Sequence, residues 1–235
     1  MSNKKAYLKE MGIDVWLERN PSIPESSVAV EPISAKETFP PEITVVESVA
    51  APVEPVETTD IEKLDWRELH AQASKCQLCD LSQTRTQTIL GSGKKTADLM
   101  IIADDTNEQS GALLTAMLKA MGFQRSDVYI SDIVKCNLPE SKEASDEQAH
   151  SCEPFLLRQI SLLQPKLILA LGNAAAQRLL KSKSTMNRLR GQLHYVDGIN
   201  VPILVSYHPA YLLAAPNEKR KAWQDIQFAM KELNA

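Results

Sequence analysis

Four short apolar runs recur from residue 97 onward, and they limit the fold of this chain more than any other feature. The runs cover residues 97–103, 128–134, 167–171 and 201–207. Each is continuously apolar and rich in β-forming side chains, as expected of strands covered on both faces of a sheet. Helical patterns lie between and after them, at residues 111–121, 145–163, 173–180 and 217–233. This alternation predicts an α/β domain with a mainly parallel sheet, whose functional edge lies at the carboxyl ends of the strands.

Residues 21–60 differ in composition from the rest of the chain. They hold seven of the thirteen prolines, eight acidic residues against the single basic Lys36, and no glycine. Such a segment cannot bury a core, so we predict an extended, disordered linker. The domains predicted are therefore a peptide over residues 1–20, the linker over 21–60 and a folded domain over 61–235. A helix N-cap is expected at Asp60, where this domain begins.

The chain contains no run of about 18 apolar residues, and its first residues lack the apolar core of a secretory signal. Both features predict a cytoplasmic protein with no membrane partner. The net charge of −4 does not exclude nucleic acid, because residues 61–235 hold 21 basic against 19 acidic side chains. Lys135, Arg188 and Arg190 are candidate phosphate contacts, although no basic stripe supports them.

An apolar stripe marks the first twenty residues. Its members recur at helical steps of three and four residues, and they are Tyr7, Leu8, Met11, Val15 and Trp16. Isolated by a linker, so short a helix is marginal in water. The stripe is either a peptide that orders on a partner or an arm that docks on its own domain.

The only four cysteines of the chain are candidate ligands of one site. Cys76 and Cys79 form a Cys-x-x-Cys pair, and Cys136 and Cys152 follow downstream. Four thiolates bind zinc or an iron–sulfur cluster, and spacing alone does not choose between them. Disulfides are disfavoured because no secretory signal is present, whereas ordinary buried cysteines stay open as an alternative.

Residues 76–230 resemble the family 4 uracil-DNA glycosylases. The matching motifs are, in order, Cys-x-x-Cys, Leu81 to Arg85, Gly91-Ser-Gly93, Ala97-Asp98-Leu99-Met100, Asp127-Val-Tyr129-Ile130, Val134-Lys-Cys136, Cys152, Pro165-Lys166, Ala170-Leu-Gly172, Arg190-Gly191 and Tyr207-His-Pro-Ala-Tyr-Leu-Leu213. The resemblance implies a three-layer αβα fold with a mainly parallel four-stranded sheet. It also implies that the four cysteines hold a [4Fe-4S] cluster.

The chain departs from that family where the chemistry is done. After the first strand it reads Ala103-Asp-Asp-Thr-Asn107, without the family's loop proline, glycines and stacking phenylalanine, and Asp104 stands in place of a glutamate. Ser131-Asp132 replaces the Thr-Asn pair that reads uracil. His208 is retained, in the loop that the family uses to stabilise the uracil anion and enter the minor groove. Asp104 and His208 are therefore the catalytic candidates. Their simpler alternatives are structural, with Asp104 as a helix N-cap and His208 as a partner in a turn hydrogen bond.

The N-terminal peptide looks like that of the psi subunit of bacterial DNA polymerase III. The likeness rests on Tyr7-Leu8-x-x-Met11-Gly12-Ile13-x-x-Trp16. It implies that the peptide binds the clamp-loader ATPase subunits and that the folded domain binds the chi subunit.

Two main functions follow from the sequence. We favour a non-catalytic adaptor of the clamp-loader assembly, because the altered loops remove much of the stacking and hydrogen bonding that repays base extrusion. The alternative is a divergent family 4-like uracil-DNA glycosylase of base-excision repair. A cluster-bearing DNA-binding module is a third hypothesis, and direct DNA binding is left open.

Overall fold

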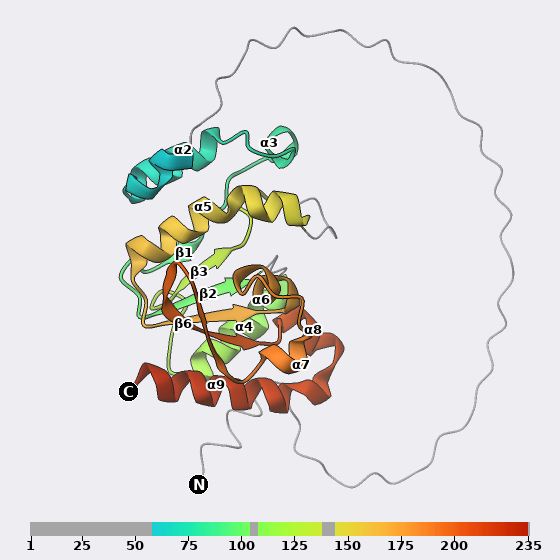
Figure 1. Ribbon diagram of the computed structural model, residues 1–235. Coiled ribbons are helices and arrows are strands. Elements are labelled where there is room, and N and C mark those ends of the chain that lie inside the picture. The colour runs from blue at the N-terminus through green and yellow to red at the C-terminus, as the bar shows by residue number, and fades with distance from the viewer. Residues whose placement is uncertain (1–57, 104–107, 138–143, 235) are drawn as a thin grey trace, which may run out of the picture. The chain divides into compact units, whose positions relative to one another are not determined.

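The computed structural model describes residues 58–103, 108–137 and 144–234. The peptide predicted over residues 1–20, residues 21–57 of the predicted linker, and Asp104 lie outside the described residues. The rest forms a sheet with helices on both faces, as Figure 1 shows. The predicted three-layer αβα fold is therefore confirmed.

The central sheet has six strands in the described residues, two more than predicted, in the order β1-β3-β2-β4-β6-β5. Its four inner strands are parallel, and they are β2 (Leu99–Ala103), β3 (Tyr129–Asp132), β4 (Leu167–Leu171) and β6 (Ile199–Ser206). The register places Met100 beside both Tyr129 and Ile168. All four were predicted from their apolar runs.

The two additional strands lie at the edges and are antiparallel. β1 (Ser92–Gly93) pairs with β3, and β5 (Leu193–Val196) pairs with β6. The side chains of β1 are exposed and those of β5 are largely half-buried. Because neither strand is buried on both faces, neither needs a continuously apolar sequence, and neither has one. The predicted four-stranded sheet was wrong in this respect.

Helices connect the strands and begin at recognisable caps. Their bounds are η1 Thr58–Lys63, α2 Trp66–Lys75, α3 Leu81–Thr84, α4 Glu108–Ala120, α5 Asp146–Leu163, α6 Asn173–Leu179, α7 Met186–Leu189, α8 Pro209–Ala214, η2 Pro216–Glu218 and α9 Lys219–Leu233. Asp65 caps α2 through a capping box with Glu68, so the N-cap predicted at Asp60 was wrong. Ser145 makes the same motif with Gln148 at the start of α5. None of the described helices is both long and apolar enough to cross a membrane.

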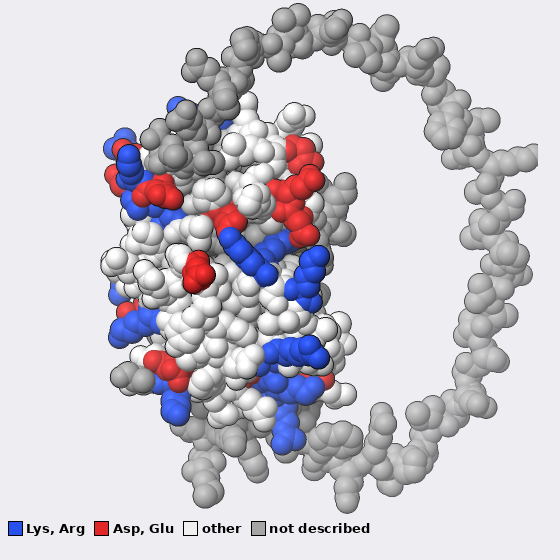
Figure 2. Space-filling model, viewed as in Figure 1, with Lys and Arg blue, Asp and Glu red and all other residues white. Residues whose placement is uncertain are grey.

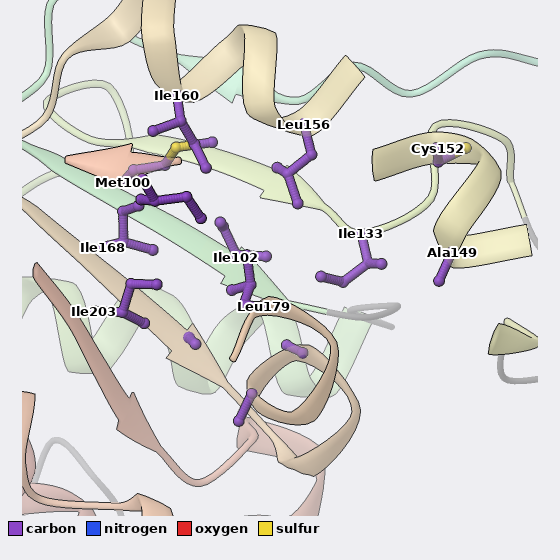
Figure 3. Close-up of a cluster of buried hydrophobic side chains, with 14 of the residues drawn as sticks. Met100, Ile102, Ile133, Ala149, Cys152, Leu156, Ile160, Ile168, Leu179 and Ile203 are labelled. Carbon is purple, nitrogen blue, oxygen red and sulfur yellow. The ribbon is translucent and has the colours of Figure 1, made fainter. Parts of the chain in front are cut away.

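Each face of the sheet is sealed by its own hydrophobic core. On one face α5 and α6 cover the side chains shown in Figure 3, among them Met100, Ile102 and Ile168. On the other face α4, α8 and α9 cover the alternate residues, such as Ile101 and Leu169. Because successive side chains of a strand point to opposite faces, strands buried on both faces must be continuously apolar.

Candidate functional site

The four cysteines lie around one small hollow. Cys76 is the C-cap of α2, Cys79 lies shortly before α3, Cys136 follows β3, and Cys152 lies on α5. Cys136 and Cys152 are buried, whereas Cys76 and Cys79 are partly exposed. All four are free thiols. The structure therefore brings the four candidate ligands together, with the pair from the first loop at the outside.

Two N–H groups point at the sulfur atoms of the buried pair. The Arg85 guanidinium donates from Nη1 to Sγ of Cys136 at 3.3 Å, and the Lys135 peptide N–H lies 3.5 Å from Sγ of Cys152. Burial raises the pKa of Cys152 to about 11, although the Lys135 N–H and its ammonium group oppose the shift. Burial also raises the pKa of Cys79. A metal that binds here must therefore displace protons from the thiols.

Four thiols can hold a single zinc ion or an iron–sulfur cluster. Among residues 58–103, 108–137 and 144–234, no three His, Cys, Asp or Glu side chains are placed to hold one metal ion. A tetrahedral zinc site needs every sulfur about 2.3 Å from the same ion. Four thiols around a shared hollow, with N–H donors to sulfur, also suit an iron–sulfur cluster, so the residues present fit that group.

A groove of about 1310 Å³ runs past the carboxyl ends of the parallel strands. Ile133 after β3, Gly172 after β4 and His208 after β6 all line it. The N–H of Gly172 donates to the Ser206 carbonyl at 2.9 Å, which links the ends of β4 and β6. Ligands of open α/β sheets bind at this edge, so the groove is the candidate ligand site.

His208 is held in one orientation at the N-terminus of α8. Its Nδ1 accepts a hydrogen bond from the Ala210 N–H at 3.2 Å. A nitrogen that accepts carries no proton, so this bond assigns the proton to Nε2. The predicted turn hydrogen bond of His208 is thus present, and it leaves the ring as a neutral N–H donor.

Gly172 allows His208 to approach the end of β4. Its φ of +98° is unfavourable for any other residue, and a Cβ atom built on it would lie 3.1 Å from Cβ of His208. Glycine is therefore required here both by backbone conformation and by the imidazole that packs over it.

Tyr207, the residue before His208, holds the same loop in place through contacts of its ring and its hydroxyl. Its ring stacks on Tyr211 at 5.1 Å between centroids, and the Arg190 guanidinium lies 5.4 Å from the ring centre. Its hydroxyl donates to Oδ1 of Asn187 at 3.0 Å, so α7 is tied to the loop. Tyr207, Tyr211 and Asn187 all line the groove.

Two basic side chains of the groove, Arg178 and Lys181, pair with acidic side chains of α5. Arg178 lies 3.7 Å from Asp146, and Lys181 lies 2.8 Å from Glu153. In Figure 2, acidic side chains gather at the upper right, and basic side chains lie below them on the same side. A phosphate backbone entering the groove would compete with the carboxylates of α5 for these cations.

The three predicted phosphate contacts have different surroundings. Lys135 is only 2 % exposed, and its ammonium donates to the Ser131 hydroxyl at 2.8 Å. Arg190 is paired with buried Asp225. Lys135 and Arg190 are therefore not exposed phosphate contacts, and those two predictions were wrong. Of the three residues, Arg188 is the exposed one.

A buried polar network includes Tyr129 and Ser131 of β3, and the sequence analysis missed it. The Ser131 hydroxyl donates to Oε1 of Gln159 at 2.9 Å, and Gln159 in turn donates to the Tyr129 hydroxyl at 3.2 Å and to the Leu90 carbonyl. Gln159 is a fully buried amide on α5, and because it directly follows Arg158, no local pattern in the sequence distinguishes it from a surface residue.

Comparisons with known proteins agree with this architecture. The model of the uracil DNA glycosylase superfamily matches residues 91–227. The type-4 uracil-DNA glycosylase of Thermotoga maritima is 31% identical over 173 residues, which cover 67% of this chain and 89% of the relative. That of Archaeoglobus fulgidus is 28% identical over 184 residues, covering 71% and 92%. These relatives favour the glycosylase hypothesis, which the sequence analysis placed second, over the adaptor hypothesis.

Proposed function

This chain belongs to the uracil-DNA glycosylase superfamily, and we propose that its folded domain is a divergent uracil-DNA glycosylase. The observation that carries the proposal is the placement of His208. Its imidazole lies over Gly172 at the carboxyl edge of the sheet, in the groove lined by the ends of three parallel strands. The names of the type-4 relatives support the same substrate.

His208 is suited to stabilising a departing base. Cleavage of the bond between uracil and its sugar leaves negative charge on the base. A neutral imidazole that donates from Nε2 can hydrogen-bond an oxygen on which that charge develops. Because Ala210 fixes the other ring nitrogen, no reorientation of the ring is required during the reaction.

The altered loops predict slow catalysis. Asp104 directly follows Ala103, the last residue of β2, and its carboxylate is the candidate base or cation stabiliser. The family's stacking phenylalanine and recognition asparagine are replaced, so less of the cost of base extrusion is recovered. We therefore expect weak uracil release that depends on both Asp104 and His208.

Uracil release from single- and double-stranded oligonucleotides tests this function. His208→Ala should lower the rate by roughly 10²–10³, as for loss of one donor to a developing anion. His150→Ala is the matched control, because His150 also lines the groove but its side chain is 84% exposed. Equal rates for the wild type and His208→Ala would show that His208 takes no part in uracil release. No release by the wild type would refute the proposal that the domain is a glycosylase.

We further propose that Cys76, Cys79, Cys136 and Cys152 hold a [4Fe-4S] cluster. When bound, the cluster would cross-link α2, the segment after β3 and α5, and it would supply a one-electron redox centre. The chain's own residues provide the four sulfurs and the N–H donors from Arg85 and Lys135. Iron and sulfide analysis of anaerobically purified protein distinguishes this cluster from zinc.

An adaptor role is the second candidate, and the pairing of the groove cations with α5 carboxylates favours it. In this role the N-terminal peptide, with Tyr7, Leu8, Met11 and Trp16, would bind clamp-loader ATPase subunits as a psi subunit does. The folded domain would bind the chi subunit. The predicted linker over residues 21–60 would let both ends engage at once.

Binding of the full chain to purified clamp-loader subunits tests the adaptor. Trp16→Ala should weaken binding, because tryptophan is enriched among interface anchors. Phe39→Ala, an aromatic change within the linker, should leave it unaltered. If Trp16→Ala instead lowers thermal stability without affecting binding, the segment docks on its own domain.

A further inference from the structure

Arg85 joins three parts of the cysteine site. Its Nη1 donates to the Ala73 carbonyl at 3.1 Å and to Sγ of Cys136 at 3.3 Å. Its Nη2 donates to the Ser74 carbonyl at 2.6 Å. Its own backbone N–H caps α3 by donating to the Leu81 carbonyl at 2.9 Å. Arg85 therefore links the segment before Cys76 and the sulfur of Cys136 through its side chain, and the segment after Cys79 through its backbone.

The acceptors of Arg85 are carbonyls and a sulfur. In the part of the chain that the structure describes, no carboxylate lies within ion-pair distance of this guanidinium. The carbonyls of Ala73 and Ser74 belong to the last turn of α2, which is the negative end of a helix dipole. Hydrogen bonds to these carbonyls hold the guanidinium in place. Their partial charges do not cancel its full positive charge, so its electric field acts on the cysteine sulfurs.

We propose that Arg85 is a positioning residue for the cluster, which orients the Cys136 sulfur and raises the reduction potential of the cluster through its charge. The inference rests on the proposed cluster. Uptake of one electron makes a thiolate-bound cluster more negative. A cation in hydrogen-bond contact with a ligand sulfur stabilises that reduced state more than the oxidised one.

The direction of the potential change separates this role from a purely structural one. Removing a positive charge from the pocket lowers the potential. Loosening the pocket so that water enters does the opposite, because water also stabilises the more highly charged state. A variant that merely relaxes the loop and a variant that removes the field should therefore shift the potential in opposite directions.

The test measures iron content, the stability of the visible absorption in air and the midpoint potential for the wild type and three variants of the full chain. Arg85→Gln removes the charge, Arg85→Lys keeps it and loses the planar fork. Arg125→Gln is the matched control, since Arg125 is exposed and donates to the Gly111 carbonyl and the Thr115 hydroxyl of α4, both at 3.4 Å.

We expect Arg85→Gln to have a lower midpoint potential and to bleach faster than the wild type. Arg85→Lys should keep a potential near that of the wild type, and Arg125→Gln should match it fully. An unchanged or higher potential in Arg85→Gln overturns the inference while leaving the cluster in place. A wild type without iron and sulfide overturns the proposed cluster itself.

A second measurement keeps the inference testable if Arg85→Gln does not fold. Wild-type protein carrying ¹⁵N-labelled arginine is reduced with dithionite, and its electron–nuclear coupling is recorded. A guanidinium nitrogen 3.3 Å from Sγ of Cys136 should give a ¹⁵N coupling that Arg85→Lys abolishes. Absence of that coupling in the wild type counts against contact between Arg85 and the cluster.

Discussion

Asp225 of α9 accepts two hydrogen bonds from the Arg190 guanidinium, at 2.6 and 3.1 Å. The same carboxylate accepts a third, from the Ser206 hydroxyl, at 2.7 Å. Asp225 is 1 % exposed, so this is a buried ion pair. It ties the last long helix to the end of β6, two residues before His208.

Breaking this pair should strongly destabilise the domain. Asp225→Ala leaves a half-buried guanidinium without its carboxylate, which typically costs about 3–5 kcal/mol. Lys166→Ala is the control, because the Lys166 and Asp98 side chains are each 63% exposed and such pairs contribute about 0–1 kcal/mol. Urea denaturation followed by circular dichroism gives both values. Equal losses would mean that the pair contributes no more than an exposed one.

Gly172→Ala should impair uracil release more than Gly198→Ala, a change at another glycine with a positive φ. Gly172 and Gly198 have φ of +98° and +84°, and Gly172 also has ψ of 164°, a conformation that is essentially restricted to glycine. Only at Gly172 does the new methyl group press on His208, since the space around Gly198 is open. We expect both variants to lose stability, and Gly172→Ala alone to release uracil more slowly. Similar activity in both variants would show that His208 tolerates the displacement.

Tyr129 should titrate far above an ordinary tyrosine. Burial raises its pKa to about 12, although the hydrogen bond from Gln159 opposes the shift. Because the folded pKa is above the unfolded value of 10, its contribution to stability is complete below pH 10 and is lost as the pH rises toward 12. In absorbance titrations at alkaline pH, Tyr129→Phe should lack a transition near pH 12. Loss of a transition near pH 10 instead would contradict the burial of this phenol.

Cys152→Ala should lose iron from protein purified without oxygen. Cys152 supplies the sulfur on α5, and three thiolates leave one corner of a four-iron cluster without its protein ligand. Ser151→Ala is the control, as Ser151 lines the same hollow without contributing a sulfur. Iron, sulfide and visible absorption should fall only in Cys152→Ala. Full retention in both would exclude Cys152 as a ligand.

The inner strands could be predicted because burial on both faces imposes one kind of sequence. Residues 167–171 match β4 in full, and the other runs overlap their strands. β1 and β5 were missed because edge strands expose part of their surface, so their sequences show no apolar run. Their pairing is decided by the neighbouring strand rather than by local composition.

The cysteines could be predicted as a group, whereas the residues around them could not. A Cys-x-x-Cys pair has a recognisable spacing, and the fold then brings Cys136 and Cys152 to it. Arg85 and Cys136 are 51 positions apart, and nothing in the sequence near either residue reports the contact. The same holds for Asp225 and Arg190, 35 positions apart, since an arginine and an aspartate are ordinary surface residues until the fold buries them.

The position of α9 also bears on how the protein is made. Ala222, Ile226 and Ala229 of α9 complete the core that covers Ile101 and Leu169 on one face of the sheet. A nascent chain that has left the ribosome only as far as β6 contains the parallel strands and α4, but the part of that face that α8 and α9 cover is still exposed to water. Transiently exposed apolar surface promotes aggregation, so we expect partly synthesised chains to aggregate more readily than the folded domain.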